Sequence, residues 1–252
     1  MMKVTVLLCE DNSHRNRIVS AVALINGCQN YFHLEAAFDS DLAKSGQKVD
    51  PGAACLRAET KHSLEHCILV TEDLFDDNWF SHEYRRSAII TVGDWEAIYA
   101  PPSLKAYVMY QLAQALIHFA SDMSEEMALN IVHEPPVGCI YDMAGRKTDL
   151  KLGMVAGNLC AQCASHLRAL GTNQNAIDAT TSIVELVRSE ALGRPVVLDP
   201  RQVFVVMRFT KSDENDNAWL YGIKPGVEKS GLVPLRADAC VESRQILEKV
   251  FN

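Results

Sequence analysis

Apolar and polar positions change their period several times along the first part of the chain. Residues Lys3–Leu8 are apolar and rich in β-branched side chains, which predicts a β-strand. The segment His14–Gln29 carries apolar residues at helical spacing and predicts a helix that ends near Gly27. A second strand is predicted for Tyr31–Phe38. The polar stretch Asp39–Thr60, which is interrupted by glycine and proline, predicts a loop or an insertion.

The middle of the chain alternates short apolar runs with a long helical pattern. Cys67–Thr71 and Ala88–Val92 are continuous apolar runs of strand length, so we predict two buried strands. Pro101–Ser103 precedes an amphipathic pattern that predicts a helix over Leu104–Ser121. Ser124–Glu126 has the residue types that cap a further, shorter helix.

A change of pattern near residue 193 predicts a domain boundary. Thr172–Gln174 can cap a helix that runs to about Ala191, and the glycine and proline of Gly193–Pro200 end it. We place the boundary in Gly193–Pro200. Beyond it the pattern predicts a strand, a helix and a second strand, at Val203–Met207, Trp219–Ser230 and Val233–Leu235.

Composition narrows the class of protein. The chain has 252 residues, of which 48% are hydrophobic and 22% charged, as in ordinary globular proteins of one or two domains. A net charge of −8 disfavours nucleic acid and anionic membranes as partners. The apolar run at the start of the chain is too short for a signal peptide or a bilayer span. We therefore expect a cytoplasmic protein whose eight cysteines are reduced thiols.

Three cysteines and a histidine between residues 133 and 163 have the spacing of metal ligands. Cys160 and Cys163 form a C-x-x-C pair, Cys139 lies 21 residues before Cys160, and His133 lies six residues before Cys139. A Cys3His set is a tetrahedral zinc site without an open position, so we expect a structural zinc ion.

Two alternatives remain open at this cluster. Cys139 can be a buried core residue and the C-x-x-C pair incidental or redox-active; a redox pair would directly follow a strand and open a helix. Gly157–Leu159 precedes the pair instead, which is more typical of a knuckle on a turn. His166, three residues beyond Cys163, competes with His133 as the fourth ligand.

The stretch CILVTEDLFDDNWF, the strand AIITV, the helix after it and the C-x-x-C pair together resemble the archaemetzincins. The resemblance covers roughly residues 65–168 and implies an α+β zincin-like domain. In that family the active-site helix carries HExxHxxGxxH, followed by cysteines that bind a second, structural zinc. His133 matches the last histidine of that pattern, Cys139 its second structural cysteine, and Cys160 and Cys163 its C-x-x-C pair. Glu134 stands where the first structural cysteine would be, so the remaining structural zinc would take His133 as its fourth ligand.

The catalytic motif of that family is missing. No HExxH occurs in the chain, and the predicted helix offers Tyr110–Gln114 in its place. Tyr110 and Gln114 cannot replace imidazole as neutral zinc ligands, and Gln111 cannot act as the general base that glutamate provides. The other placement, Met123–Met127, is no better. We therefore expect an inactive protease homologue without peptidase activity.

The last part of the chain resembles the opening half of TIR-like and nucleoside 2-deoxyribosyltransferase-like domains. The matching positions are Val205–Phe209, Ile223–Pro225, Val227, Glu228, Gly231 and Arg236–Asp238. Arg208 stands in place of the usual proline. The resemblance implies a partial α/β flavodoxin-like segment and a nucleotide site that involves Arg208, Phe209, Arg236 and Asp238. The family's catalytic glutamate comes from a later strand–helix unit, and the sequence given stops at Asn252.

Together these patterns predict three parts: a degenerate zincin-like domain with a zinc knuckle (1–170), a connecting helix and linker (171–200) and a partial TIR-like segment (201–252). The resemblances imply a non-catalytic, zinc-stapled sensor or scaffold module in bacterial nucleotide signalling or anti-phage defence. The expected partners are a nucleotide ligand and a protein partner or a second copy of the chain. The alternative is an N-glycosidase of the TIR-like type, acting on NAD or nucleosides, whose catalytic half lies in a longer parent chain.

Overall fold

The structure is a computed structural model that describes residues 1–39, 48–62, 65–77, 79–121, 123, 127, 130–193, 202–205 and 213–236. It divides into two units, Met1–Gly193 and Arg194–Asn252. The division falls at the start of the segment that the sequence pattern marks as the domain boundary.

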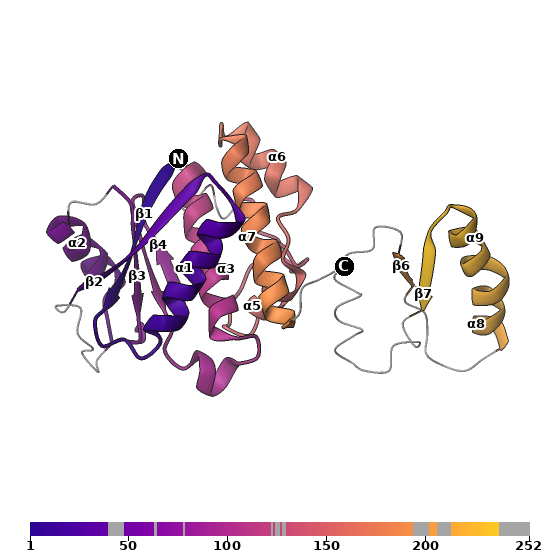
Figure 1. The fold of residues 1–252 in the computed structure, drawn as a ribbon, viewed down its shortest axis with the longest axis horizontal. Helices are drawn as coiled ribbons and strands as arrows, with labels where there is room; N and C mark the ends of the chain where they lie inside the picture. The colour runs from indigo at the N-terminus through magenta and orange to yellow at the C-terminus, as the bar shows by residue number, and fades with distance from the viewer. Residues whose placement is uncertain are drawn as a thin grey trace. The chain divides into compact units, whose positions relative to one another are not determined.

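The first unit is built on a five-stranded sheet in the order β2-β1-β3-β5-β4 (Figure 1). All neighbouring strands are parallel except β4, which is antiparallel to β5. Four of the strands agree with the sequence prediction to within about two residues, and the three-residue β4 was not predicted. The strands are β1 (Met2–Cys9), β2 (Phe32–Asp39), β3 (Cys67–Thr71), β4 (Ser81–Glu83) and β5 (Ser87–Thr91).

Helices cover both faces of this sheet. On one face lie α1 (Arg15–Cys28), α3 (Leu104–Ser121) and α7 (Gln174–Leu192), which pack against one another (Figure 1). The other face carries α2 (Pro51–His62). In β1, Val4, Val6 and Leu8 point to the three-helix face, and Leu7 packs on the side of α2. Burial of both faces explains why the strands are continuous apolar runs instead of alternating ones.

Among the described helices, α3 has most of its residues buried, and it begins and ends where the sequence predicts. The Ser103 hydroxyl accepts a hydrogen bond from the Ala106 N–H, at 3.1 Å, and so caps the first turn. Trp95, in the π-helical turn η2 (Trp95–Tyr99), stacks on Tyr107 of α3 with a centroid distance of 4.0 Å. The indole N–H of Trp95 donates to the Pro102 carbonyl, so the turn before α3 is fixed on the helix.

Helix α2 corrects the prediction of a loop or insertion over Asp39–Thr60. Pro51 occupies the first turn, and the Asp50 carboxylate accepts the Ala53 N–H at 3.0 Å. The buried positions of α2 are small residues, namely Ala54, Cys55 and Ala58. Such a face gives a weak hydrophobic pattern, which is why the sequence did not reveal the helix. Residues 40–47, within the same predicted loop, lie outside the described part of the chain, as does the cap predicted at Ser124–Glu126.

Helix α7 belongs to the first unit, although the sequence analysis assigned it to a connecting segment. The Asn173 side chain caps its first turn, and Gly193 ends it in the left-handed region with φ 66°. Its buried face packs along α3 and α5 (Leu150–Ala156). None of the helices in the described residues is long and apolar enough to cross a membrane.

The second unit contains a parallel strand pair, β6 (Gln202–Val205) and β7 (Val233–Arg236). Between them run α8 (Asp213–Asn217), a π-helical turn (Ala218–Ile223) and α9 (Lys224–Lys229). No side chain described in this unit is buried. This strand–helix–strand order agrees with the pattern, and a flavodoxin-like domain is not established by it. Three of the predicted nucleotide-site residues, Arg208, Phe209 and Asp238, lie outside the described residues, and Arg236 is the last residue of β7.

Candidate metal centre

Four side chains from two separate segments converge beside α3 and α7. His133 and Cys139 lie in the segment between α3 and α5, and Cys160 and Cys163 lie at the start of α6 (Ala161–Ala169). One donor atom from each of the four residues lies within 4.8 Å of the other three. The His133 Nε2 atom is 3.2 Å from the Cys160 Sγ and 3.1 Å from the Cys163 Sγ.

Backbone pairing positions His133 against the residues that follow Cys139. The His133 N–H donates to the Tyr141 carbonyl at 2.9 Å, and the Met143 N–H donates to the His133 carbonyl at 3.0 Å. A second short pairing joins Cys139 to Asn158, just before the C-x-x-C pair. The two pairings bring the halves of the cluster together without a regular strand.

The Asp142 carboxylate fixes the turn that presents Cys139. Its Oδ2 atom accepts hydrogen bonds from three consecutive N–H groups, those of Val137, Gly138 and Cys139. Gly138 has φ 85°, a conformation that favours glycine. The sequence pattern does not mark Asp142 as a site residue.

The C-x-x-C pair opens a helix, which differs from the knuckle on a turn expected from the sequence. Cys160 is the N-cap of α6, and its Sγ accepts the Cys163 N–H at 3.4 Å. The residues before it do form a turn, because Gly157 ends α5 in the left-handed region with φ 53°. A Cβ atom at Gly157 would lie 2.5 Å from the Val184 carbonyl oxygen of α7, so this turn requires glycine.

Hydrogen bonds between the sulfur atoms separate the acidities of Cys139 and Cys163. A hydrogen bond from the Cys163 side chain and another from the Cys160 N–H lower the pKa of Cys139 below the ordinary value of a thiol. The pKa of Cys163 is raised because its proton is held in that hydrogen bond. Thiolate is the form of cysteine that binds metals, and an ion at this site would displace the shared proton.

The donor set fits a metal ion of the zinc type. Three sulfur atoms and one imidazole nitrogen are the ligands of closed tetrahedral zinc sites, in which each ligand lies about 2.0–2.3 Å from the ion. Of the two histidines left open by the sequence, it is His133 that joins the cysteines. His166 is exposed on α6 and is not among the four converging residues.

The α3 residues at the position of the missing HExxH motif form hydrogen bonds to the loop that carries Cys139. The Tyr110 hydroxyl donates to the Cys139 carbonyl at 3.5 Å, and the Gln114 amide donates to the Ile140 carbonyl at 3.0 Å. The Gln111 amide donates to the Gln114 side-chain oxygen at 2.8 Å. Within the described residues, the Cys3His cluster is the only group of three or more His, Cys, Asp or Glu side chains close enough to share an ion.

A cavity of about 220 Å³ lies between β4, α3 and the segment 140–144. Gln114 and His118, which are one helical turn apart on α3, both line it. The sequence offers the placements 110–114 and 123–127 for the missing motif, and His118 stands in neither of them. The four-residue spacing of Gln114 and His118 was the sequence signal that could have placed both side chains on the same face of the helix. The remaining lining residues are Trp79, Phe80, Ser81, Glu83, Ile117, Val132, Ile140, Tyr141, Asp142, Met143 and Ala144.

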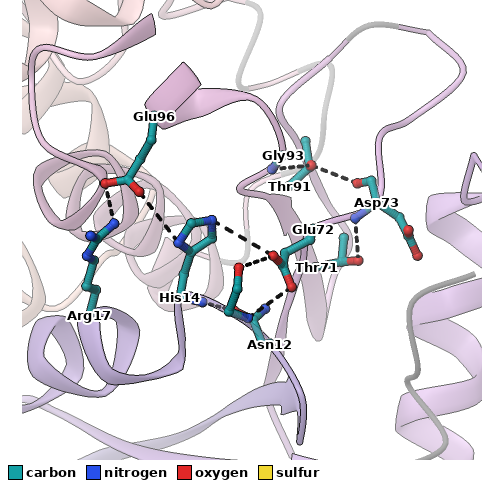
Figure 2. A network of polar contacts seen from close by, with 10 residues as sticks. Asn12, His14, Arg17, Thr71, Glu72, Asp73, Thr91, Gly93 and Glu96 are labelled. Carbon is teal, nitrogen blue, oxygen red and sulfur yellow. Dashed lines mark hydrogen bonds and ion pairs between the residues drawn. The ribbon is translucent and has the colours of Figure 1, made fainter. Parts of the chain in front are cut away.

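A separate polar network lies where β1, β3 and β5 end (Figure 2). His14 lies between two carboxylates, 3.9 Å from Glu72 and 3.8 Å from Glu96. Arg17 pairs with Glu96, and the Ser13 N–H donates to Glu72 at 3.1 Å. These groups satisfy one another, so the network ties the start of α1 to the loops after β3 and β5.

No family model and no curated protein matches this chain. Among solved structures, it is similar to an archaemetzincin from Methanopyrus kandleri, with a TM-score of 0.46 and 13% sequence identity. The match covers 68% of this chain and 96% of the archaemetzincin chain. At this degree of similarity it carries no inference about function. What the structure itself establishes is a mixed α/β unit with a mostly parallel sheet and a Cys/His cluster that can hold a metal ion.

Proposed function

We propose that the first unit binds one zinc ion through His133, Cys139, Cys160 and Cys163, and that this ion is structural. The observation that carries the proposal is the convergence of three sulfur atoms and one imidazole nitrogen within 4.8 Å. Four protein ligands complete a zinc tetrahedron, so no position remains for a catalytic water molecule or a substrate. When bound, the ion supplies a cross-link and no reaction chemistry.

The cross-link has a clear structural task. It ties the irregular segment after α3 to the first turn of α6, two parts of the chain that are joined by no regular strand pairing in the described residues. A site that is not preformed in the unfolded chain adds its metal-binding free energy to folding. Zinc binding therefore stabilises the loop that packs on α3.

We further propose that the chain is a non-catalytic binding module. Tyr110 and Gln114 hydrogen-bond the loop that carries Cys139, and no peptidase base stands among them. A role in nucleotide signalling or anti-phage defence stays a prediction from the sequence. So does the alternative of an N-glycosidase, because its residues Arg208, Phe209 and Asp238 lie outside the described residues.

Elemental analysis of the purified chain tests the zinc proposal. We expect about one zinc per chain in protein never exposed to a chelator, and a loss of most of it in Cys160→Ser. The matched control is Cys28→Ser, since Cys28 is also half-buried but lies on α1, away from the cluster. Less than about a tenth of an equivalent in the parent protein, or a full equivalent in Cys160→Ser, would reject the proposal.

A further inference from the structure

The cavity beside the metal centre has an acidic and aromatic lining. Trp79 and Phe80, which precede β4, form an edge-to-face pair with a centroid distance of 5.7 Å, and both line the cavity. Tyr141 lines it from the segment after Cys139. Aromatic faces attract cations through the quadrupole of the ring.

The charged residues of the lining are acidic. Glu83, at the end of β4, and Asp142 contribute carboxylates, and no lysine or arginine is among the described lining residues. One Asp142 oxygen accepts the three N–H groups of the turn at residues 137–139, which leaves the other oxygen for a further donor. A concave site lined by one sign of charge favours ligands of the opposite sign.

Two polar atoms of this wall lack hydrogen bonds. The Tyr141 hydroxyl and the Asp142 Oδ1 atom are shielded from solvent, and neither has a hydrogen-bond partner among the described residues. Buried polar groups in proteins are nearly always paired, so the unpaired atoms of these two lining residues mark hydrogen-bonding capacity that the described residues leave unused. This observation is independent of the charge of the lining.

We propose that this cavity binds a small organic cation, with an ammonium or guanidinium head and a short apolar body. The head satisfies the carboxylates and the aromatic faces, and the body lies against Ile117 and Ile140. A bare metal ion is disfavoured, because the lining residues described do not form a group of three ligands close together. The volume of about 220 Å³ corresponds to roughly seven water molecules, which suits a short alkyl cation.

The direct test is a calorimetric titration of the full, zinc-loaded chain with n-butylammonium and n-butylguanidinium. n-Butanol and butyrate at the same ionic strength are the neutral and anionic comparisons. We expect the cations to bind at least about tenfold more tightly than butanol, and butyrate not to bind. A capped Gly-Lys-Gly peptide separates the two sources of such a head group: binding of the peptide assigns the site to a lysine side chain, and binding of the free amines alone assigns it to a metabolite.

The variant Glu83→Gln removes one carboxylate from an exposed position on the edge strand β4. We expect it to weaken binding of the cation about fivefold or more without changing zinc content or thermal stability. Glu35→Gln is the matched control, because Glu35 is exposed on β2, the opposite edge of the same sheet. Butanol binding as tight as the cations, or equal weakening by both variants, would overturn the proposal.

Discussion

Buried cysteines in two parts of the first unit differ in acidity. Cys55 of α2 and Cys67 of β3 lie in an apolar cluster with Leu7, Leu69 and Ile89, and burial raises the pKa of both thiols to about 12. In the other group, hydrogen bonds from Cys163 and Cys160 lower the pKa of Cys139 below the ordinary value of a thiol. Burial alone therefore does not make a cysteine a ligand. What distinguishes the second group is the convergence of sulfur atoms, N–H donors and an imidazole.

The largest difference between the two groups is expected in stability. Cys139→Ser removes one of the proposed metal ligands, and we expect a loss of at least about 3 kcal/mol, or roughly 6–12 °C in the unfolding midpoint. Cys67→Ala, which removes one buried sulfur from the apolar cluster, is expected to cost only about 1 kcal/mol. Thermal unfolding followed by circular dichroism compares them, and equal costs would show that the cluster acts only by packing.

The raised pKa values of Cys55 and Cys67 predict a loss of stability at alkaline pH. In the folded protein, burial raises the pKa of the Cys55 and Cys67 thiols to about 12, whereas the ordinary value is 9.0. Their contribution is complete below pH 9 and is lost as the pH rises toward 12, because the unfolded chain releases these protons first. Between about pH 9 and pH 10 we expect each thiol to lower the free energy of unfolding by about 1 kcal/mol.

Denaturant unfolding at several pH values measures this slope. The double variant Cys55→Ala/Cys67→Ala should show a flatter dependence over the same range, although its stability at neutral pH is lower. If the double variant shows the same dependence of the unfolding free energy on pH as the parent protein, the two thiols do not have raised pKa values in the folded state.

The two groups of cysteines should differ in their rate of alkylation after treatment with a chelator. Cys160 is half-buried, so we expect a chelator to increase its labelling by iodoacetamide about tenfold in the native protein. Cys55 and Cys67 are buried and keep their protons, and they should react only on unfolding. Peptide mass spectrometry assigns the labelled sites. Labelling of Cys67 as fast as Cys160 would contradict this assignment.

The smallest expected effect concerns peptide hydrolysis, which we predict to be absent. The one metal-capable group in the described residues is a closed Cys3His set, and α3 presents Tyr110, Gln111 and Gln114 at the motif position. Incubation with a mixed peptide library should give no cleavage, and His118→Ala should leave that result unchanged. Cleavage that a zinc chelator abolishes would refute the prediction.

The sequence predicted the elements whose signals are local. β3 and α3 have the predicted bounds, because a continuous apolar run marks a strand covered on both faces, and Ser103 with its prolines marks the start of the helix. Helix α2 was missed, since its buried face consists of small residues. The three-residue β4 has no fully buried position and no pattern of its own.

The convergence of the candidate metal ligands was predictable in part for the same reason. The spacing of Cys139, Cys160 and Cys163 is a local signal and identified the cluster. The choice between His133 and His166 was not available from spacing, because it depends on the pairing of His133 with Tyr141 and Met143. The cavity was not predictable at all, since its lining comes from segments that meet only in the folded chain.

Asp142 takes part in both sites of this unit. One carboxylate oxygen holds the turn that carries Cys139, and the same residue lines the cavity. If the proposed ion orders Cys139, we expect it to order this wall as well, and a guest that binds Asp142 would steady the turn. Binding at two sites that share one side chain is then thermodynamically linked, and the linkage is reciprocal. If the ion multiplies the affinity for the guest by some factor, the guest multiplies the affinity for the ion by the same factor.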